Sequence, residues 1–114
     1  MSTGKIRNKS LAHNKKVVAC KLLGPEFQKR KAEVLAALKS KIVKKEALAN
    51  GYQFTFSGSD EILDELVEFI KTERACCSFF TFRLEVEDAT TPVTLSIIGP
   101  QHAKEFIATE MGLI

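Results

Sequence analysis

The topology is decided by the stretch Asn50-Gly51-Tyr52-Gln53-Phe54-Thr55-Phe56-Ser57. Asn-Gly is the strongest two-residue signal for a β-hairpin, because a type I′ turn needs positive φ at both central residues. Aromatic and polar residues then alternate, which is typical of a strand with one buried face. Residues 43–49 give a weaker strand pattern before the turn. We therefore predict a hairpin of strands 43–49 and 51–57, with strand 43–49 at an edge of the sheet.

A strand and a helix precede this hairpin. Residues 17–23 are largely apolar and predict a first strand, in which Cys20 faces away from Lys21. Gly24-Pro25 opens a helix, because proline is tolerated in a first turn where its missing N–H costs little. The apolar residues that recur at helical spacing in this segment are Phe27, Val34, Leu35, Leu38 and Ile42.

A second helix, two strands and a short helix follow the hairpin. Residues 58–61 offer capping oxygens and acids for a helix N-terminus. The buried stripe of that helix comprises Ile62, Leu63, Leu66, Phe69 and Ile70, and its extension reaches Cys76 and Cys77. Alternation then predicts a one-sided strand over 80–87, a turn at 88–92 and a further strand from Val93 to Ile97. Gly99-Pro100 opens the last helix, anchored by Phe106 and Ile107.

This order of elements predicts an α+β fold. The first six elements match a ferredoxin-like βαββαβ plait, extended by a C-terminal β-α, with helices on one face of an antiparallel sheet. In that arrangement strands one and three are central, strand four flanks strand one, and the fifth strand lies beyond it. If 43–49 is only the end of a helix, the alternative is a smaller α+β sheet of four strands.

Composition indicates one domain with a basic arm. The chain has 114 residues, of which 45% are hydrophobic and 27% are charged, as in a globular domain. The net charge of residues 1–16 is +5, whereas that of the whole chain is +3, so the remaining residues have a net charge of −2. We predict a disordered basic arm at 1–16 and a single α+β domain at 17–114. No stretch resembles a signal peptide or membrane span, which favours the cytoplasm.

Two function classes are disfavoured. In RNA-recognition modules aromatic residues lie on the open face of the sheet. Here the residues between them, Gln53, Thr55 and Ser57, cannot fill a core, so the aromatic residues must face inward. Conventional enzyme patterns are missing too: the histidines are His13 and His102, and there is no phosphate-binding glycine loop. Nucleic-acid binding and catalysis are therefore not the favoured functions.

The cysteines Cys20, Cys76 and Cys77 are the candidate chemistry. An odd number of thiols in a chain without an export signal predicts reduced cysteines. Thiolates are ligands for soft metals such as Zn(II), Cu(I) or Hg(II), with no other cofactor indicated. The negative end of the helix dipole disfavours a thiolate in the last turn, so soft-metal binding ranks ahead of redox catalysis. Packing as small hydrophobic residues is the alternative.

A resemblance adds to this reading. Glu73-Arg74-x-Cys76-Cys77-x-Phe79, with Phe82-x-Leu84 and a later Ile98-Gly99-Pro100, resembles a core motif of small, functionally uncharacterised bacterial proteins. The similarity covers about residues 17–110 and includes an early strand cysteine, here Cys20. Ser78 stands where that set tends to have proline. The resemblance implies a shared fold and a cysteine trio that belongs together, and it implies no activity.

Two hypotheses follow. In the first, Cys20, Cys76 and Cys77 form a thiol or soft-metal site whose rim is shaped by Glu73 and Arg74. Those two residues could equally form a structural ion pair or surface contacts. In the second, the cysteines only pack, and the protein is a non-catalytic interaction or homodimerisation module. Its contact surface would be a sheet edge or the open sheet face, formed by Gln53, Thr55, Thr81, Arg83, Thr94 and Ile98.

Overall fold

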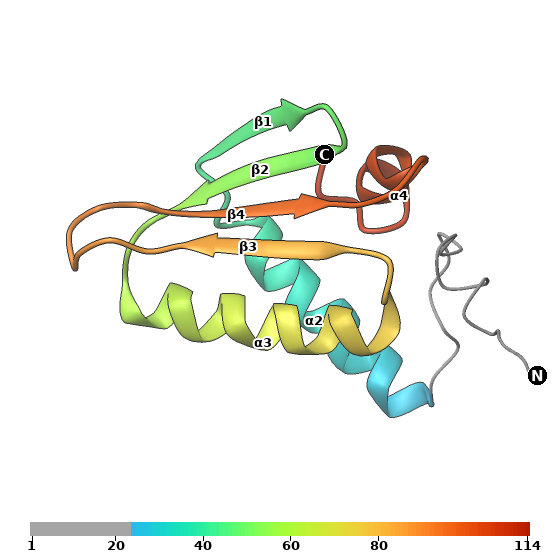
Figure 1. The fold of residues 1–114 in the computed structure, drawn as a ribbon. Helices are drawn as coiled ribbons and strands as arrows, with labels where there is room; N and C mark the ends of the chain where they lie inside the picture. Colours follow the sequence, from blue (N-terminus) through green and yellow to red (C-terminus); the bar gives the residue numbers. More distant parts are fainter. Residues whose placement is uncertain (1–23) are drawn as a thin grey trace, which may run out of the picture.

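The computed structural model describes residues 24–114, in which four strands form one antiparallel sheet. The helices α2 and α3 lie together on one side of this sheet, and α4 lies at its end (Figure 1). The predicted arm at 1–16, the predicted strand at 17–23 and Cys20 lie outside the described residues. In chain order the elements are α2 (Pro25–Lys39), β1 (Lys44–Leu48), β2 (Gly51–Phe56), α3 (Asp60–Cys76), β3 (Thr81–Glu85), β4 (Val93–Ile98) and α4 (Ala103–Thr109).

The predicted α+β class is confirmed, but the ferredoxin-like strand order is wrong. The observed order is β1-β2-β4-β3, so β4 lies between β2 and β3 instead of beyond an edge. A tight turn at Asp88 joins β3 to β4, which keeps the two strands adjacent. The inward residues of β4 are almost completely buried, whereas Phe82 and Leu84 of β3 are only partly buried. A strand with such residues needs neighbours on both sides, and β4 has them.

The hairpin of β1 and β2 is confirmed, although its turn differs from the prediction. Leu48 pairs with Gly51, so the two-residue turn is Ala49-Asn50. Within residues 24–114, His102 is the only non-glycine residue with positive φ, so the turn is not type I′. Gly51 is needed for a different reason: a Cβ there would lie 1.9 Å from the carbonyl oxygen of Ile97 on β4. Glycine at position 51 therefore permits the close pairing of β2 with β4.

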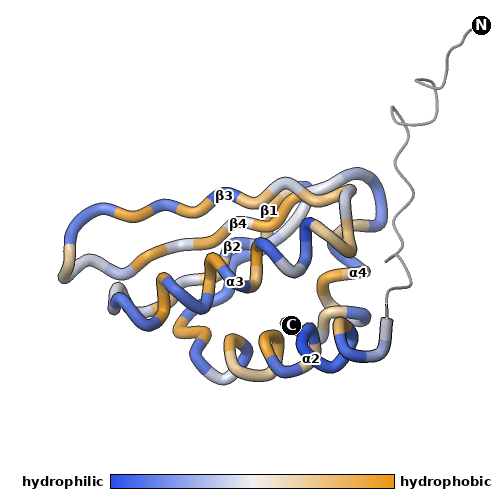
Figure 2. The backbone as a smooth tube through the Cα atoms, turned by 90° about the horizontal axis from the view of Figure 1, so that it is seen from below, coloured by the Kyte–Doolittle hydropathy of each residue, from blue (hydrophilic) through white to orange (hydrophobic). Residues whose placement is uncertain are grey.

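The two long helices differ in how they are attached. In α3 the Ser59 hydroxyl caps the first turn by accepting a hydrogen bond from the Ile62 N–H at 3.2 Å. Its buried face includes Ile62, Leu66 and Phe69, as the spacing predicts. The helix α2 buries only Leu38 completely, and exposed ion pairs join it to α3: Arg30 with Glu68, and Lys41 with Glu65 at 2.6 Å. Figure 2 shows the two helices on the same side of the sheet.

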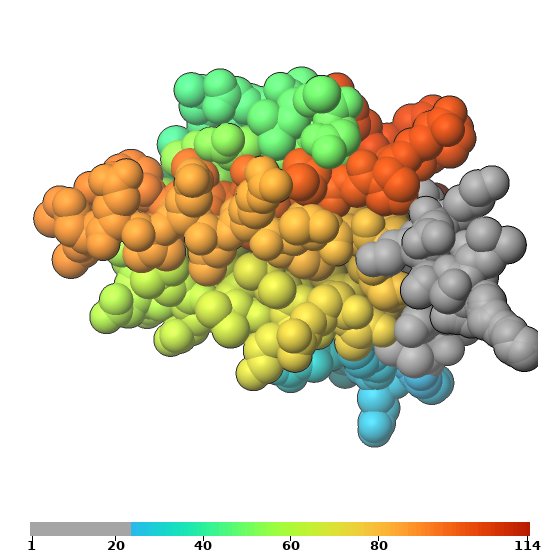
Figure 3. All heavy atoms as spheres, in the orientation of Figure 1, coloured from blue at the N-terminus to red at the C-terminus, as the bar shows by residue number. Residues whose placement is uncertain are grey.

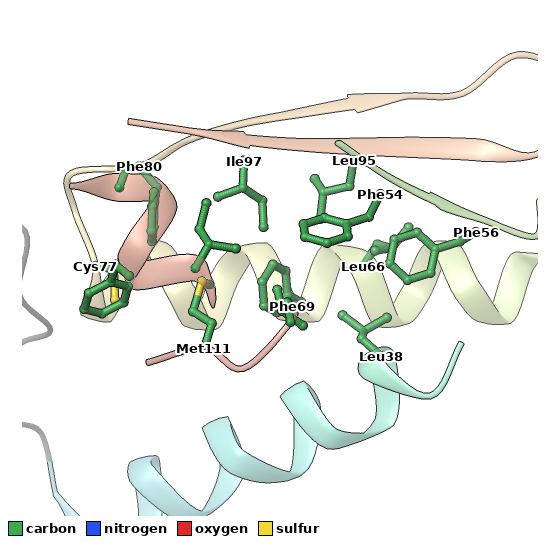
Figure 4. Close-up of a cluster of buried hydrophobic side chains, with 14 of the residues drawn as sticks. Leu38, Phe54, Phe56, Leu66, Phe69, Cys77, Phe80, Leu95, Ile97 and Met111 are labelled. Carbon is green, nitrogen blue, oxygen red and sulfur yellow. The ribbon is translucent and has the colours of Figure 1, made fainter. Parts of the chain in front are cut away.

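The core lies between the sheet and the helices (Figure 4). Leu66 and Phe69 of α3 meet the inward residues of the central strands, and Phe69 packs edge-on against Phe82 with ring centroids 6.0 Å apart. The other sheet face is more polar, because Gln53, Thr55 and Thr94 alternate with the buried residues. None of the described helices is long and apolar enough to cross a membrane.

Candidate thiol site at the end of α3

The structure places two of the three cysteines predicted to form the site in the core, and Cys77 is a free thiol. Cys76 is the last residue of α3 and Cys77 is its C-cap, and both are 0% exposed. The prediction that the buried stripe of this helix continues to both cysteines is therefore confirmed. Figure 4 shows Cys77 at one end of the core cluster, where α3 ends. Cys20, the third predicted thiol, lies outside the described residues.

The two residues predicted to shape the rim of the site lie in different environments. The side chain of Arg74 is at the surface, whereas Glu73 is 0% exposed. Neither carboxylate oxygen of Glu73 accepts a hydrogen bond of ordinary geometry within the described residues. A buried carboxyl group without such a bond is unfavourable, because it has lost its hydration without gaining a protein donor. Glu73 is therefore the most unusual side chain of the described part of the chain.

Helical spacing explains how a glutamate reaches the core. Leu66, Phe69, Glu73 and Cys76 follow one another at intervals of three or four residues, so they share the buried face of α3. The sequence contained this signal, since the stripe passes through Glu73 before it reaches the cysteines. The neighbouring buried Thr72 is different, because its hydroxyl donates a hydrogen bond of 2.8 Å to the Glu68 carbonyl.

Glu73 and Cys77 are electrostatically coupled. Cys77 follows Glu73 by one helical turn, and its backbone N–H donates to the Glu73 carbonyl oxygen. Its thiol also acts as a weak donor toward the Glu73 carboxyl group, without meeting the geometry of an ordinary hydrogen bond. Burial raises the pKa of Glu73, and the positive charge of Lys31 on α2 opposes that rise.

The Cys77 thiol is protonated at neutral pH. Burial, reinforced by the charge of Glu73, raises the pKa of Cys77 to about 12, against a smaller opposing effect of Lys31. A thiol in this state is a poor nucleophile, because the thiolate is the reactive form. This agrees with the expectation that a helix C-terminus does not activate a cysteine.

Aromatic residues fix the chain where it leaves α3. Phe79 and Phe80 are buried and pack against each other, with ring centroids 4.5 Å apart. Both also contact Phe106 of α4, at 5.2 Å from Phe79 and 5.8 Å from Phe80. These rings fix the turn that follows the cysteines and make the surroundings of the Cys77 thiol apolar. Any charge that develops on Cys77 is therefore poorly solvated.

The described residues alone do not form a complete metal site. Within residues 24–114, no three side chains of the His, Cys, Asp or Glu type converge closely enough to hold a metal ion. Glu73 and Cys77 form a pair of potential ligands, one oxygen and one sulfur, in a closed apolar setting. A complete tetrahedral site needs further donors.

Comparisons with known proteins found no match for this chain among protein-family models, curated proteins or solved structures.

Proposed function

We propose that this is a small cytosolic protein whose Cys20, Cys76 and Cys77 form a thiol site that binds a soft metal ion. Zn(II), Cu(I) and Hg(II) are the candidate ions, because thiolates are the ligands that these ions prefer. The proposal does not include catalysis, since the Cys77 thiol is held in its unreactive, protonated form.

The observation that carries this proposal is the composition of the end of α3. Two buried cysteines, of which Cys77 is a free thiol, lie at the end of the helix that carries a fully buried carboxyl group without an ordinary hydrogen bond. Packing alone accounts for the cysteines, since cysteine is among the most buried residue types. Packing gives no reason for a buried glutamate at position 73, because an apolar residue of similar size would fill the same space without removing a carboxyl group from water. A bound cation supplies such a reason.

Metal titration of the reduced, full-length protein tests this proposal. We expect one equivalent of Zn(II), Cu(I) or Hg(II) to bind, and a Cys20→Ser/Cys76→Ser/Cys77→Ser variant to lose that binding. Thiolate-to-metal charge-transfer absorption with Hg(II) or Cu(I), and native mass spectrometry with Zn(II), give the stoichiometry. Circular dichroism checks that the triple variant is folded. Equal, weak binding by both proteins would refute the proposal.

The second candidate is an interaction or homodimerisation module in which the cysteines only pack. It is favoured by the complete burial of Cys76 and Cys77 within one continuous core cluster. The contact surface would be the open sheet face, on which Gln53, Thr55 and Arg83 are neighbours through β4. In this case Cys77→Ala lowers stability and changes no ligand binding. Analytical ultracentrifugation over a wide concentration range tests for the dimer, and Arg83→Glu should weaken it.

A further inference from the structure

We infer that the outer edge of β3 is a self-association surface, where β3 pairs antiparallel with β3 of a second copy of this chain and the two sheets become one. This inference goes beyond the proposed thiol site and does not depend on it. It also differs from the interaction module described above, because the contact lies along an edge of the sheet and not on its open face.

The two edge strands of the sheet differ in how they are protected. Within residues 24–114, β1 pairs only with β2 and β3 pairs only with β4, so each has one side without a partner strand in this part of the chain. Lys45 of β1 lies directly opposite Phe54, which places its charge on the helix side of the sheet. An inward-pointing charge of this kind prevents another strand from joining an edge. The residues of β3 on that side are Phe82 and Leu84, so β3 lacks this protection.

The helix side of β3 is apolar and incompletely covered. Phe82 and Leu84 are only partly buried, although both pack against the core. Val86, which continues their alternation, is 47% exposed. Apolar side chains in a row along an unprotected edge favour the addition of another strand. A second copy of β3 would cover them.

The helix α3 continues this apolar surface. Leu63, Val67 and Ile70 recur at intervals of four and three residues, so they share one side of the helix, and Val67 is 46% exposed. Glu65 and Glu68, which form the ion pairs with α2, lie on another side, so the apolar side faces away from α2. The helix α3 and the strand β3 lie next to each other on one face of the molecule (Figure 3). In a two-fold dimer, the apolar side of α3 therefore faces the same side of α3 in the second copy.

Charge selects the register of the pair. On the open face of the sheet, Arg83 and Glu85 are exposed, and neither forms an ion pair within residues 24–114. When Leu84 lies opposite Leu84 of the second copy, Arg83 of each chain lies opposite Glu85 of the other. The same register places Phe82 opposite Val86, so opposite charges meet on one face of the sheet and apolar side chains meet on the other. A register centred on Arg83 would instead place two arginines opposite each other, which is unfavourable.

Charge reversal tests this register. Sedimentation velocity measures the self-association of the reduced, full-length protein over a wide concentration range. We expect a dimer, and we expect Arg83→Glu or Glu85→Arg alone to raise its dissociation constant about tenfold or more, because each change places like charges opposite each other at both ends of the pairing. An equimolar mixture of the two variants should regain wild-type affinity as a heterodimer, which native mass spectrometry distinguishes from either homodimer.

A second pair of variants tests the helix side of the edge. Val86→Lys gives β3 the inward-pointing charge that Lys45 provides on β1, so it should dissociate the dimer. Val43→Lys is the matched control, because Val43 is 72% exposed and lies directly before β1. It should leave the dimer intact. Circular dichroism checks that both variants are folded.

The outcomes separate an edge contact from a contact through the open face. Thr55→Glu adds a charge to the open face, away from β3, and should leave the edge dimer unchanged. The inference is overturned if the wild-type protein stays monomeric at every concentration, or if Thr55→Glu dissociates the dimer while Val86→Lys does not. It is also overturned if Arg83→Glu and Glu85→Arg do not form a heterodimer when they are mixed.

Discussion

Glu73 and Cys77 lie one helical turn apart at the end of α3, and neither side chain is reached by solvent. Burial and the charge of Glu73 both disfavour the thiolate form of Cys77, and burial also disfavours the charged form of Glu73, although the Cys77 thiol opposes that second effect. Burial of this pair therefore makes an unfavourable electrostatic contribution to the free energy of folding. The first two predictions below concern this contribution in the reduced protein without metal.

Glu73→Gln should stabilise the metal-free protein at neutral and alkaline pH. The pKa of Glu73 is raised in the folded state above its ordinary value of 4.5, so wild-type stability falls as the pH rises through that range. We expect the variant to gain about 1 kcal/mol or more in the free energy of unfolding at pH 8, because an unsatisfied buried charged group costs more than the neutral amide that replaces it. Urea denaturation at pH 5 and pH 8 measures the gain, which should be smaller at pH 5. A loss of stability at pH 8 would contradict this prediction.

Cys77→Ala should remove part of the alkaline sensitivity of the fold. The pKa of Cys77 rises from 9.0 to about 12 on folding, so the folded state holds a proton that the unfolded chain releases above pH 9. Wild-type stability should therefore decrease between pH 9 and about 12, and the decrease should be shallower in the variant. Free energies of unfolding at pH 7.5, 9 and 10.5 test this. Identical slopes in the two proteins would show that Cys77 does not titrate as described.

Asp88→Ala should weaken the β3–β4 connection in a pH-dependent way. One oxygen of Asp88 accepts hydrogen bonds from the N–H and hydroxyl groups of Thr90 and Thr91, which lowers the pKa of Asp88 to about 2. The connection projects at one end of the molecule (Figure 3). The stability that Asp88 contributes is present at neutral pH and is lost as the pH falls from 3.8 toward 2. Wild type and variant should therefore differ at pH 7 and converge near pH 2 in thermal unfolding.

Gly51→Ala should be far more damaging than Gly24→Ala. A Cβ at Gly51 would lie 1.9 Å from the Ile97 carbonyl oxygen, whereas a Cβ at Gly24 meets nothing within 4 Å. Forcing β2 away from β4 should lower the free energy of unfolding by about 1–3 kcal/mol or prevent folding. At Gly24, the N-cap of α2, the loss should stay within about 1 kcal/mol. Similar losses for both variants would show that β2 and β4 can separate easily.

The helix α2 should open before the rest of the domain. Only Leu38 of α2 is completely buried, and its ion pairs with α3 are exposed. Screening these pairs with 1 M salt, or removing one by Glu68→Gln, should speed amide exchange in α2 by less than about tenfold, because exposed pairs contribute little. Exchange around Leu66 in α3 should not change. If α2 and α3 accelerate together, they open as one unit. Hydrogen exchange read by mass spectrometry distinguishes these cases.

Local patterns predicted the elements well and the strand order poorly. The alternation in 51–57, the cap at Ser59 and the stripe leading to Cys76 each depend on neighbouring residues, and each is present in the structure. The position of β4 depends on a competition between possible partners for β2, which no local pattern contains. Phe82 and Leu84 suggest as much burial as Val93 and Leu95 when only the sequence is considered, yet β3 is at an edge.

The candidate site was predicted in part for a similar reason. Burial of Cys76 and Cys77 followed from helical spacing. The interior position of Glu73 follows from the same spacing. A charged residue normally predicts a surface position, however, so its burial is predicted only if the helical spacing is weighted above the charge. The proximity of Cys20 to the end of α3 stays a prediction, because Cys20 lies outside the described residues.

The strand order also has a kinetic consequence. The pairs β1–β2 and β3–β4 each close through a short connection, whereas β2 and β4 pair across the whole of α3, with Phe56 opposite Val93. Each hairpin can form from local contacts, but the sheet becomes continuous only when this long-range pairing closes, which is the slower event in a chain of this kind. Since α3 lies within that loop, we expect the Cys77 thiol to become shielded from alkylating reagents only at that step. The rate at which Cys77 becomes protected from alkylation during refolding would then report the rate at which the two hairpins pair through β2 and β4.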